Sequence, residues 1–279
     1  MTTNSLKSLA LLGAICLGIV TLSGCGHYTT QRTSNVLTYL NPGDMQPMDV
    51  SKDIAKTSLP NIPVPITLGI AFVPESRTIT GGRDIKIEPL TEKVKMEMMQ
   101  ELTAQLRQYS IFARIEEIPT TYLKIGGGFA NLDQIHTMTG VDVIGLVSYD
   151  QIQFTDRGLV SLMYWTGIGW YFVPGEKNDT NTMMDAALYH IPTRKPLLRA
   201  TGQSGVYHYS TPMNQSQNLR DDSEHGFKDA LHMLAANFKE QLNLLTPKLV
   251  HAAAGSPSAG SGKQWKPRSP CIVCGRLQQ

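Results

Sequence analysis

The chain has 279 residues, of which 41% are hydrophobic, and its formal net charge at pH 7 is +2. This length is enough for one or two globular domains, and the near-balance of charge argues against a nucleic-acid-binding protein, which needs a strongly basic surface. The sequence contains no P-loop, no dinucleotide-binding glycine motif and no nucleophile-elbow motif.

Residues 1–24 have the layout of a secretory signal peptide. Lys7 is their only charged residue, and an uncharged apolar run follows it and ends in small residues. The run is close to the length of a membrane span, but three glycines interrupt it and no basic cluster follows it. We therefore favour a cleaved signal over the alternative, a retained anchor helix.

The tetrapeptide Leu22-Ser23-Gly24-Cys25 closes this run and resembles a bacterial lipobox, the processing site of lipoproteins. The resemblance implies that the Cys25 thiol receives a diacylglyceryl group, that the chain is cut between Gly24 and Cys25, and that the new amine is acylated. Two or more acyl chains hold a protein stably on a bilayer. Gly26 in place of Asp resembles the enterobacterial sorting signal for the outer membrane, on its periplasmic face; the inner membrane and the cell surface remain open.

Residues 25–65 are polar and rich in proline, and they show neither the period of a strand nor that of a helix. We expect them to form a lipidated N-terminus and a flexible tether that holds the folded domain away from the bilayer.

An alternation of strands and helices begins after this region. Residues 66–73 form an apolar run that predicts a buried strand, and the TITGGRD stretch is expected to be a loop. An apolar stripe at helical spacing predicts a helix over residues 90–109, and residues 111–118 are expected to form the next strand.

A short helix and a long strand are expected next. Asn131 is suited to cap a helix over residues 132–139, and Gly140 is suited to end it. The apolar run VDVIGLV then predicts a strand that continues toward Phe154.

Two apolar segments flank a proline-bounded turn and predict an antiparallel hairpin over residues 183–191 and 197–206. A last amphipathic helix is expected over residues 222–245 and to end at Pro247. Together these elements predict a single α/β (α+β) domain, residues 66–247, with a mixed, partly antiparallel sheet packed by two or more long helices.

The uncharged segment 158–175 is the most aromatic part of the chain. It fits a partly buried apolar hairpin, an exposed partner-binding patch, or a loop that touches the membrane, where tryptophan and tyrosine are favoured. The candidate contact residues are Tyr164, Trp165, Trp170, Tyr171 and Phe172.

Residues 175–202, together with the lipobox, resemble the rhombotail lipoproteins, a bacterial family of unassigned function. The resembling parts are an Asn-Asp-Thr turn, a Met-Asp-Ala strand and an Arg-Lys…Arg-Ala strand. Asp179 and Asp185 lack a third carboxylate for a cation site, so we expect an Asx turn at Asn178–Asp179. The chain lacks the apolar C-terminal segment expected of this family.

Residues 248–279 carry five basic residues and no acid and are expected to form a flexible basic tail, which is either solvated or in contact with an anionic surface. Cys271 and Cys274 form a lone C-x-x-C pair. Zinc ribbons need a second pair, and an exported protein lies in an oxidising compartment. We therefore expect a local disulfide; a redox or metal role and unpaired thiols are the alternatives.

The remaining polar residues show no catalytic pattern. Seven histidines are scattered without metal-binding spacing, and Ser204 and His208 lack a visible orienting acid and oxyanion pocket. We therefore expect no catalytic residue, metal or cofactor.

The sequence predicts a membrane-anchored periplasmic lipoprotein that is not an enzyme and acts as a partner-binding or accessory factor in envelope assembly or secretion. Its expected partners are the lipid bilayer, through acylated Cys25, and an unidentified envelope protein, but no nucleic acid. Two alternatives remain: an envelope hydrolase built on scattered Asp and His residues, and a homo-oligomeric element of a secretion pore that uses residues 158–175 as its contact.

Overall fold

The computed structural model describes residues 27–41, 60, 62–81, 90–157, 176–211 and 214–254. Its elements in chain order are β1 (His27–Ser34), α2 (Val36–Leu40), β2 (Ile66–Phe72), β3 (Glu75–Gly81), α4 (Glu92–Leu106), β4 (Phe112–Ile118), the 3-10 turn η1 (Thr120–Tyr122), α5 (Gly128–Thr139), β5 (Val143–Arg157), β6 (Glu176–His190), β7 (Lys195–Ser210) and α7 (Gln215–Ala254).

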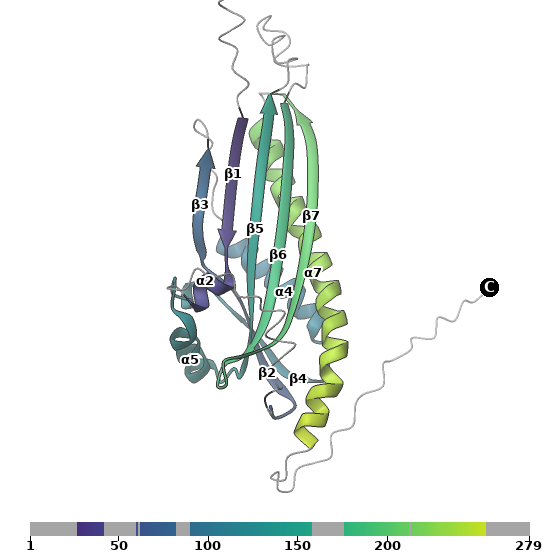
Figure 1. Cartoon of the computed structure of the whole chain (residues 1–279). Helices are drawn as coiled ribbons and strands as arrows, with labels where there is room; N and C mark the ends of the chain where they lie inside the picture. The colour runs from purple at the N-terminus through teal and green to yellow at the C-terminus, as the bar shows by residue number, and fades with distance from the viewer. Residues whose placement is uncertain are drawn as a thin grey trace, which may run out of the picture.

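The seven strands form one mixed sheet, which confirms the predicted α+β fold class. The strand order is β3-β1-β5-β2-β4, with β6 pairing with β5 and β7 pairing with β6. β2 runs parallel to β4 and β5, and the other pairs are antiparallel. β5 is long enough to pair with β2 along its first half and with β1 along its second half. Figure 1 shows β5, β6 and β7 running side by side along the length of the molecule.

Helices cover the two faces of the sheet to different extents. On the inner face, α4 and α7 pack a core that includes Phe72, Tyr149, Phe227 and Phe238. On the outer face, α2 and α5 pack a second core on the lower halves of β5 and β6 (Figure 1). The described helices therefore leave the outer face of the upper sheet uncovered.

The long helix α7 approaches β7 most closely at Gly202. A Cβ atom at this glycine would lie 2.0 Å from the Ala230 carbonyl oxygen and 2.4 Å from the Leu234 nitrogen. The absence of a side chain at position 202 is therefore what allows the helix to lie directly on the strand.

The predicted tether over residues 25–65 is wrong for residues 27–41, which form β1 and α2. β1 pairs with both β3 and β5, and Asn35 caps α2 by accepting hydrogen bonds from the backbone N–H groups of Leu37 and Thr38. Thr30, Arg32 and Ser34 of β1 are buried or half-buried polar residues. A strand of this kind has no hydrophobic alternation to reveal it. The domain therefore begins at β1 and not at residue 66.

The C-terminal boundary also differs from the prediction. α7 starts before residue 222 and continues past Pro247 to Ala254, so the first residues of the predicted basic tail are helical. Leu249 is 2% exposed and belongs to the inner core. We attribute the continuation of the helix to this burial, which offsets the hydrogen bond that proline cannot donate.

Three local predictions are wrong, and two are confirmed. Part of the TITGGRD stretch belongs to β3, and α5 begins at Gly128 rather than at a cap formed by Asn131. The expected turn at residues 178–179 lies within β6. Gly140 does end α5 in the left-handed conformation, with φ of 69°. The predicted hairpin forms as β6 and β7.

None of the helices within the described residues combines the length and the apolar composition that crossing a bilayer requires.

Candidate functional site

The predicted lipidation and cleavage residues, the aromatic contact residues and the C-x-x-C cysteines lie outside the described residues: Gly24, Cys25, Tyr164, Trp165, Trp170, Tyr171, Phe172, Cys271 and Cys274. The structure does place the strand ends next to them. His27 pairs with Asp156 across β1 and β5, and Arg157 pairs with Glu176 across β5 and β6. The chain therefore enters the sheet after Cys25 at the same end at which the segment 158–175 joins two strands.

A large groove lies between α4 and α7, and we call it the α4–α7 groove. It has a volume of about 860 Å³ and opens over the inner face of the sheet near β1 and β5. Its lining residues are Thr30, Arg32, Leu90, Thr91, Lys93, Val94, Glu97, Met98, Glu101, Gln153, Ser216, Leu219, Arg220, Ser223, Glu224, Phe227 and Lys228.

Buried amide and hydroxyl groups support the floor of the α4–α7 groove. The Ser223 Oγ–H donates to Gln151 Oε1 at 2.7 Å, and Arg32 Nη2 donates to Ser223 Oγ at 3.0 Å. Gln151 Nε2 donates to Thr182 Oγ1 at 2.8 Å and to the Ser223 carbonyl at 3.1 Å. Next to this network, Gln153 Nε2 donates to the Leu219 carbonyl at 2.8 Å. These bonds add polar contacts between α7 and the sheet to the hydrophobic contacts of the inner core.

The network includes a half-buried charge, Arg32. Burial lowers the pKa of the Arg32 guanidinium, while the nearby Tyr149 and Glu75 oppose this shift. The Tyr149 hydroxyl donates to Glu75 Oε1, and burial followed by this bond raises the pKa of Tyr149. Tyr149 therefore stays protonated, and its ring packs edge-on against Phe227 with centroids 5.3 Å apart. Arg32 and Glu75 are both half-buried, and the opposite charge of Glu75 favours the charged form of Arg32.

The walls of the groove are apolar, whereas its rim is charged. Val94 and Met98 come from α4, Leu90 lies just before that helix, and Leu219 and Phe227 come from α7. The groove therefore combines an apolar surface with a border of positive and negative side chains.

The charges on the rim compensate one another within and across the two helices. Lys228 Nζ lies 2.6 Å from Glu224 Oε1 on α7, and Glu224 raises the pKa of Lys228, as do Glu101 and Glu97 across the groove on α4. Exposed pairs of this kind contribute little to stability. They set the charge pattern of the groove rim.

The structure does not assemble the acyl-transfer pair considered from the sequence. Ser204 and His208 lie four residues apart on β7, about 13 Å along a strand. Ser204 Oγ donates to Asp229 at 3.4 Å, and His208 Nδ1 contacts Asp222. The two side chains therefore bind separate acids on α7.

The two aspartates considered as a cation site are also separated. Asp179 lies 3.0 Å from Lys177 Nζ, and Asp185 lies 2.7 Å from Arg199 Nε. Burial raises the pKa of Asp185, and Arg199 opposes the shift. Asn178 is buried, accepts a hydrogen bond from Thr155 Oγ1 and donates to Ser210 Oγ.

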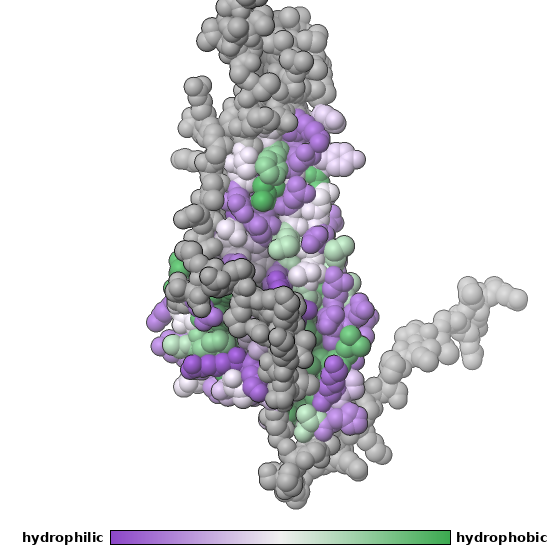
Figure 2. Space-filling view, in the orientation of Figure 1, coloured by the Kyte–Doolittle hydropathy of each residue, from purple (hydrophilic) through white to green (hydrophobic). Residues whose placement is uncertain are grey.

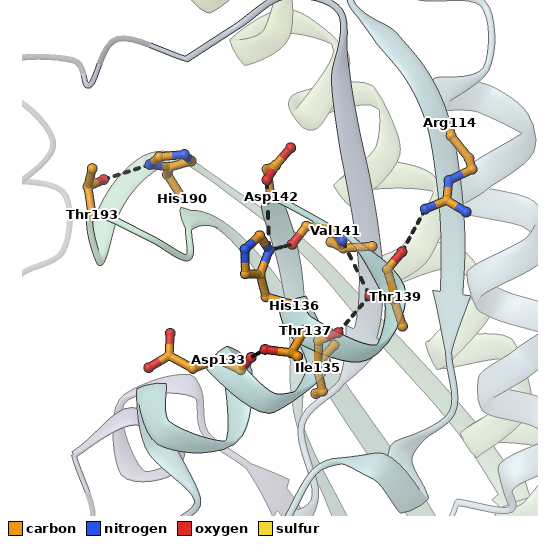
Figure 3. Close-up of polar contacts among 10 residues, drawn as sticks. All are labelled: Arg114, Asp133, Ile135, His136, Thr137, Thr139, Val141, Asp142, His190 and Thr193. Atoms are coloured by element: carbon orange, nitrogen blue, oxygen red, sulfur yellow. Dashed lines mark hydrogen bonds and ion pairs between the residues drawn. The ribbon is translucent and has the colours of Figure 1, made fainter.

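A second polar cluster lies at the lower end of the molecule, around the end of α5 (Figure 3). His136 Nδ1 lies 2.8 Å from the Val141 carbonyl oxygen and 3.7 Å from Asp142 Oδ1, and His190 Nδ1 lies 2.8 Å from Thr193 Oγ1. Burial is the main cause that lowers the pKa of His190. Across the described part of the chain, no group of three His, Cys, Asp or Glu side chains is placed to hold a metal ion.

Sequence reasoning missed the floor of the groove. One signal that could have revealed it is an alternation of polar residues in β5, where Gln151, Gln153 and Thr155 continue the inward positions of an apolar strand. β6 carries a matching series, Asn178, Thr180 and Thr182, and all six side chains are buried. Two strands with inward-facing polar residues predict a polar layer beneath a helix.

Comparisons with known proteins add little to this description. No family model matches the chain, and no curated protein matches it. A solved structure of a neuraminyllactose-binding hemagglutinin homolog from Helicobacter pylori is similar over 72% of this chain and 97% of that chain, with 8% sequence identity and a TM-score of 0.33. A likeness of this extent carries no argument about what this chain binds.

Proposed function

We propose that the protein is a lipoprotein of the bacterial envelope, anchored through acylated Cys25 at the periplasmic face of the outer membrane, and that its folded body binds an envelope protein without catalysing a reaction. The observation that carries the proposal is the run of residues 8–21 followed by Leu22-Ser23-Gly24-Cys25. A thiol at this place, beside small residues, is what lipoprotein processing uses. The resemblance of residues 175–202 to the rhombotail lipoproteins supports the same assignment.

Membrane attachment tests the first part of this proposal. Cells that express the full chain are fed an alkyne-bearing fatty acid, and the protein is then isolated from separated inner and outer membranes. We expect label in the outer-membrane protein and none in the Cys25→Ser variant, because only the thiol can form the thioether. A matched Cys16→Ser variant should keep the label. Equal labelling of the Cys25→Ser chain would contradict the proposal.

The α4–α7 groove is the part of the folded body that we propose binds the partner. Its apolar walls and its compensated rim suit a protein segment that carries apolar side chains flanked by charges of both signs. Within the described residues, its lining presents no nucleophile beside a base, so the site favours recognition over reaction.

A charge placed on the groove wall tests this assignment. Val94 is half-buried in α4 and lines the groove, so Val94→Lys should abolish cross-linking of the envelope partner by putting an ammonium group on an apolar contact surface. Met138 on α5 is 67% exposed and lies outside the groove, so Met138→Lys is the matched control and should retain the partner. Retention by both variants would remove the groove from the proposal.

A further inference from the structure

We infer that the upper end of the sheet contacts the headgroup region of the bilayer, so that no flexible tether separates the folded domain from the membrane. The inference rests on the proposed lipidation of Cys25. It concerns the surface formed by Phe154, Tyr207 and Tyr209 on the outer face of the sheet, which we call the tip surface.

The length of chain between the lipid and the sheet sets the distance to the bilayer. β1 begins at His27 and pairs with Asp156 of β5 from that first residue on. Cys25 precedes His27 by two residues, and two residues of extended chain span at most about 7 Å. A lipid on Cys25 therefore holds the end of β1 at the surface of the bilayer.

The tip surface carries aromatic side chains where the bilayer would meet it. Phe154 pairs with Asp179, and Asp179 pairs with Tyr207, so the three lie in one row on one face of the sheet. Tyr209 follows two residues after Tyr207 and shares its face. Phe154 is 44% exposed, Tyr207 is 70% exposed and Tyr209 is 64% exposed. Exposed aromatic residues of this kind are favoured at the membrane–water interface.

The polar residues of the same row fit a shallow position in the headgroups. Asp179 forms an ion pair with Lys177, whose Nζ lies 3.0 Å away. The two residues would therefore enter the headgroup region as a pair of opposite charges. Figure 2 shows hydrophobic and hydrophilic residues mixed on this part of the sheet face. A mixed surface suits contact with lipid headgroups, whereas burial in the hydrocarbon core would require an uninterrupted apolar band.

This orientation places the α4–α7 groove close to the membrane. Arg32 of the groove lies five residues along β1 from His27, about 17 Å at 3.3 Å per residue. The turn between β6 and β7 lies at the far end, about 46 Å from Glu176 along β6. The partner that enters the groove must therefore present its binding segment near the bilayer surface.

Spin labels on the lipidated full chain test the inference. In a Cys271→Ser/Cys274→Ser background, the label is attached at Tyr207→Cys or, as the matched control, at Leu244→Cys, which is 57% exposed at the wild-type leucine and lies about 43 Å along α7 from its first residue. The protein is reconstituted into vesicles of phosphatidylethanolamine and phosphatidylglycerol. Accessibility to oxygen, which enters the bilayer, is compared with accessibility to a water-soluble nickel chelate.

We expect the oxygen-to-nickel ratio at position 207 to exceed that at position 244 several-fold. Equal ratios at the two positions would overturn the inference, and so would protection of position 207 from both reagents together with dipolar broadening, which indicates contact with a second copy. The intact mass of the same sample reports acylation separately. Equal ratios on an acylated chain overturn the tip contact alone, whereas an unmodified Cys25 overturns the lipid anchor on which it rests.

Discussion

Gln151 illustrates how single polar residues hold the upper half of the molecule together. Its amide joins β5 to β6 through Thr182 and to α7 through Ser223. Such a network stabilises the fold only while every buried donor and acceptor has a partner, because an unpaired buried group costs more than a formed bond contributes.

Replacing Gln151 with Leu should lower the free energy of unfolding by about 2–3 kcal/mol, since it leaves buried polar groups of Thr182 and Ser223 unpaired. The control is Gln203→Leu at an exposed position of β7, which should change stability by less than about 0.5 kcal/mol. Urea denaturation of both variants measures the difference, and equal stabilities would show that the network contributes nothing.

His190 gives the fold a dependence on pH with a defined sign. Burial lowers its pKa in the folded protein, with Asp142 opposing the shift and His136 adding to it. Below the ordinary histidine pKa of about 6.5, the unfolded chain therefore binds a proton that the folded chain does not. Stability contributed by this residue is present above that pH and is lost as the pH falls through it.

The variant His190→Gln should lose less stability than the wild type when the pH falls from about 7.5 to about 5.5, because it removes this titration. Asp142 and His136 remain in both proteins and serve as the internal reference. Denaturant midpoints at the two pH values provide the measurement, and parallel losses in the two proteins would contradict the assignment.

At the scale of elements, the contact between β7 and α7 depends on Gly202, which has no side chain. Gly202→Ala would place a Cβ atom against backbone atoms of α7 at Ala230 and Leu234. The helix backbone cannot shift away from this atom as easily as the end of a flexible side chain could. We expect a loss of about 3 kcal/mol or more.

Gly205 on the same strand is the matched control, since its added Cβ would meet only Asn181 Oδ1 at 3.4 Å. Gly205→Ala should leave stability within about 0.5 kcal/mol of the wild type. Thermal unfolding of the two variants tests the contrast. A Gly202→Ala protein as stable as Gly205→Ala would show that the helix does not lie on the strand at this point.

The elements that sequence reasoning predicted are those whose burial follows the standard periods. α4 carries an apolar stripe, β6 and β7 flank a proline-bounded turn, and Gly140 supplies a left-handed helix end. β1 escaped prediction because its buried residues, Thr30 and Ser34, are hydroxylated. The end of α7 was misplaced because a proline rule is local, whereas the burial of Leu249 depends on the tertiary fold.

At the scale of the whole molecule, the candidate site combines residues that no local pattern connects. Arg32 and Ser223 are 191 residues apart in the chain and 3.0 Å apart in the structure, and the sheet order that joins them depends on β1, which the sequence did not reveal. Attachment is the opposite case. The proposed attachment rests on a sequence signature that ends in four consecutive residues, Leu22-Ser23-Gly24-Cys25.

The predicted attachment and the structure together indicate which end of the molecule would face the membrane. One end of the sheet receives the chain two residues after Cys25 and also bears the tip surface, while the β6–β7 turn and the end of α7 lie at the other end (Figure 1). We propose that lipid attachment at this end holds the lateral groove at a constant height above the membrane.

The mass of the intact protein purified from its native membranes is the decisive test of lipid attachment at Cys25. We expect the mass of residues 25–279 plus a diacylglyceryl group and an amide-linked acyl chain, with fragment ions that place both at Cys25. A chain that still begins at Met1, or an unmodified thiol at position 25, would contradict the account.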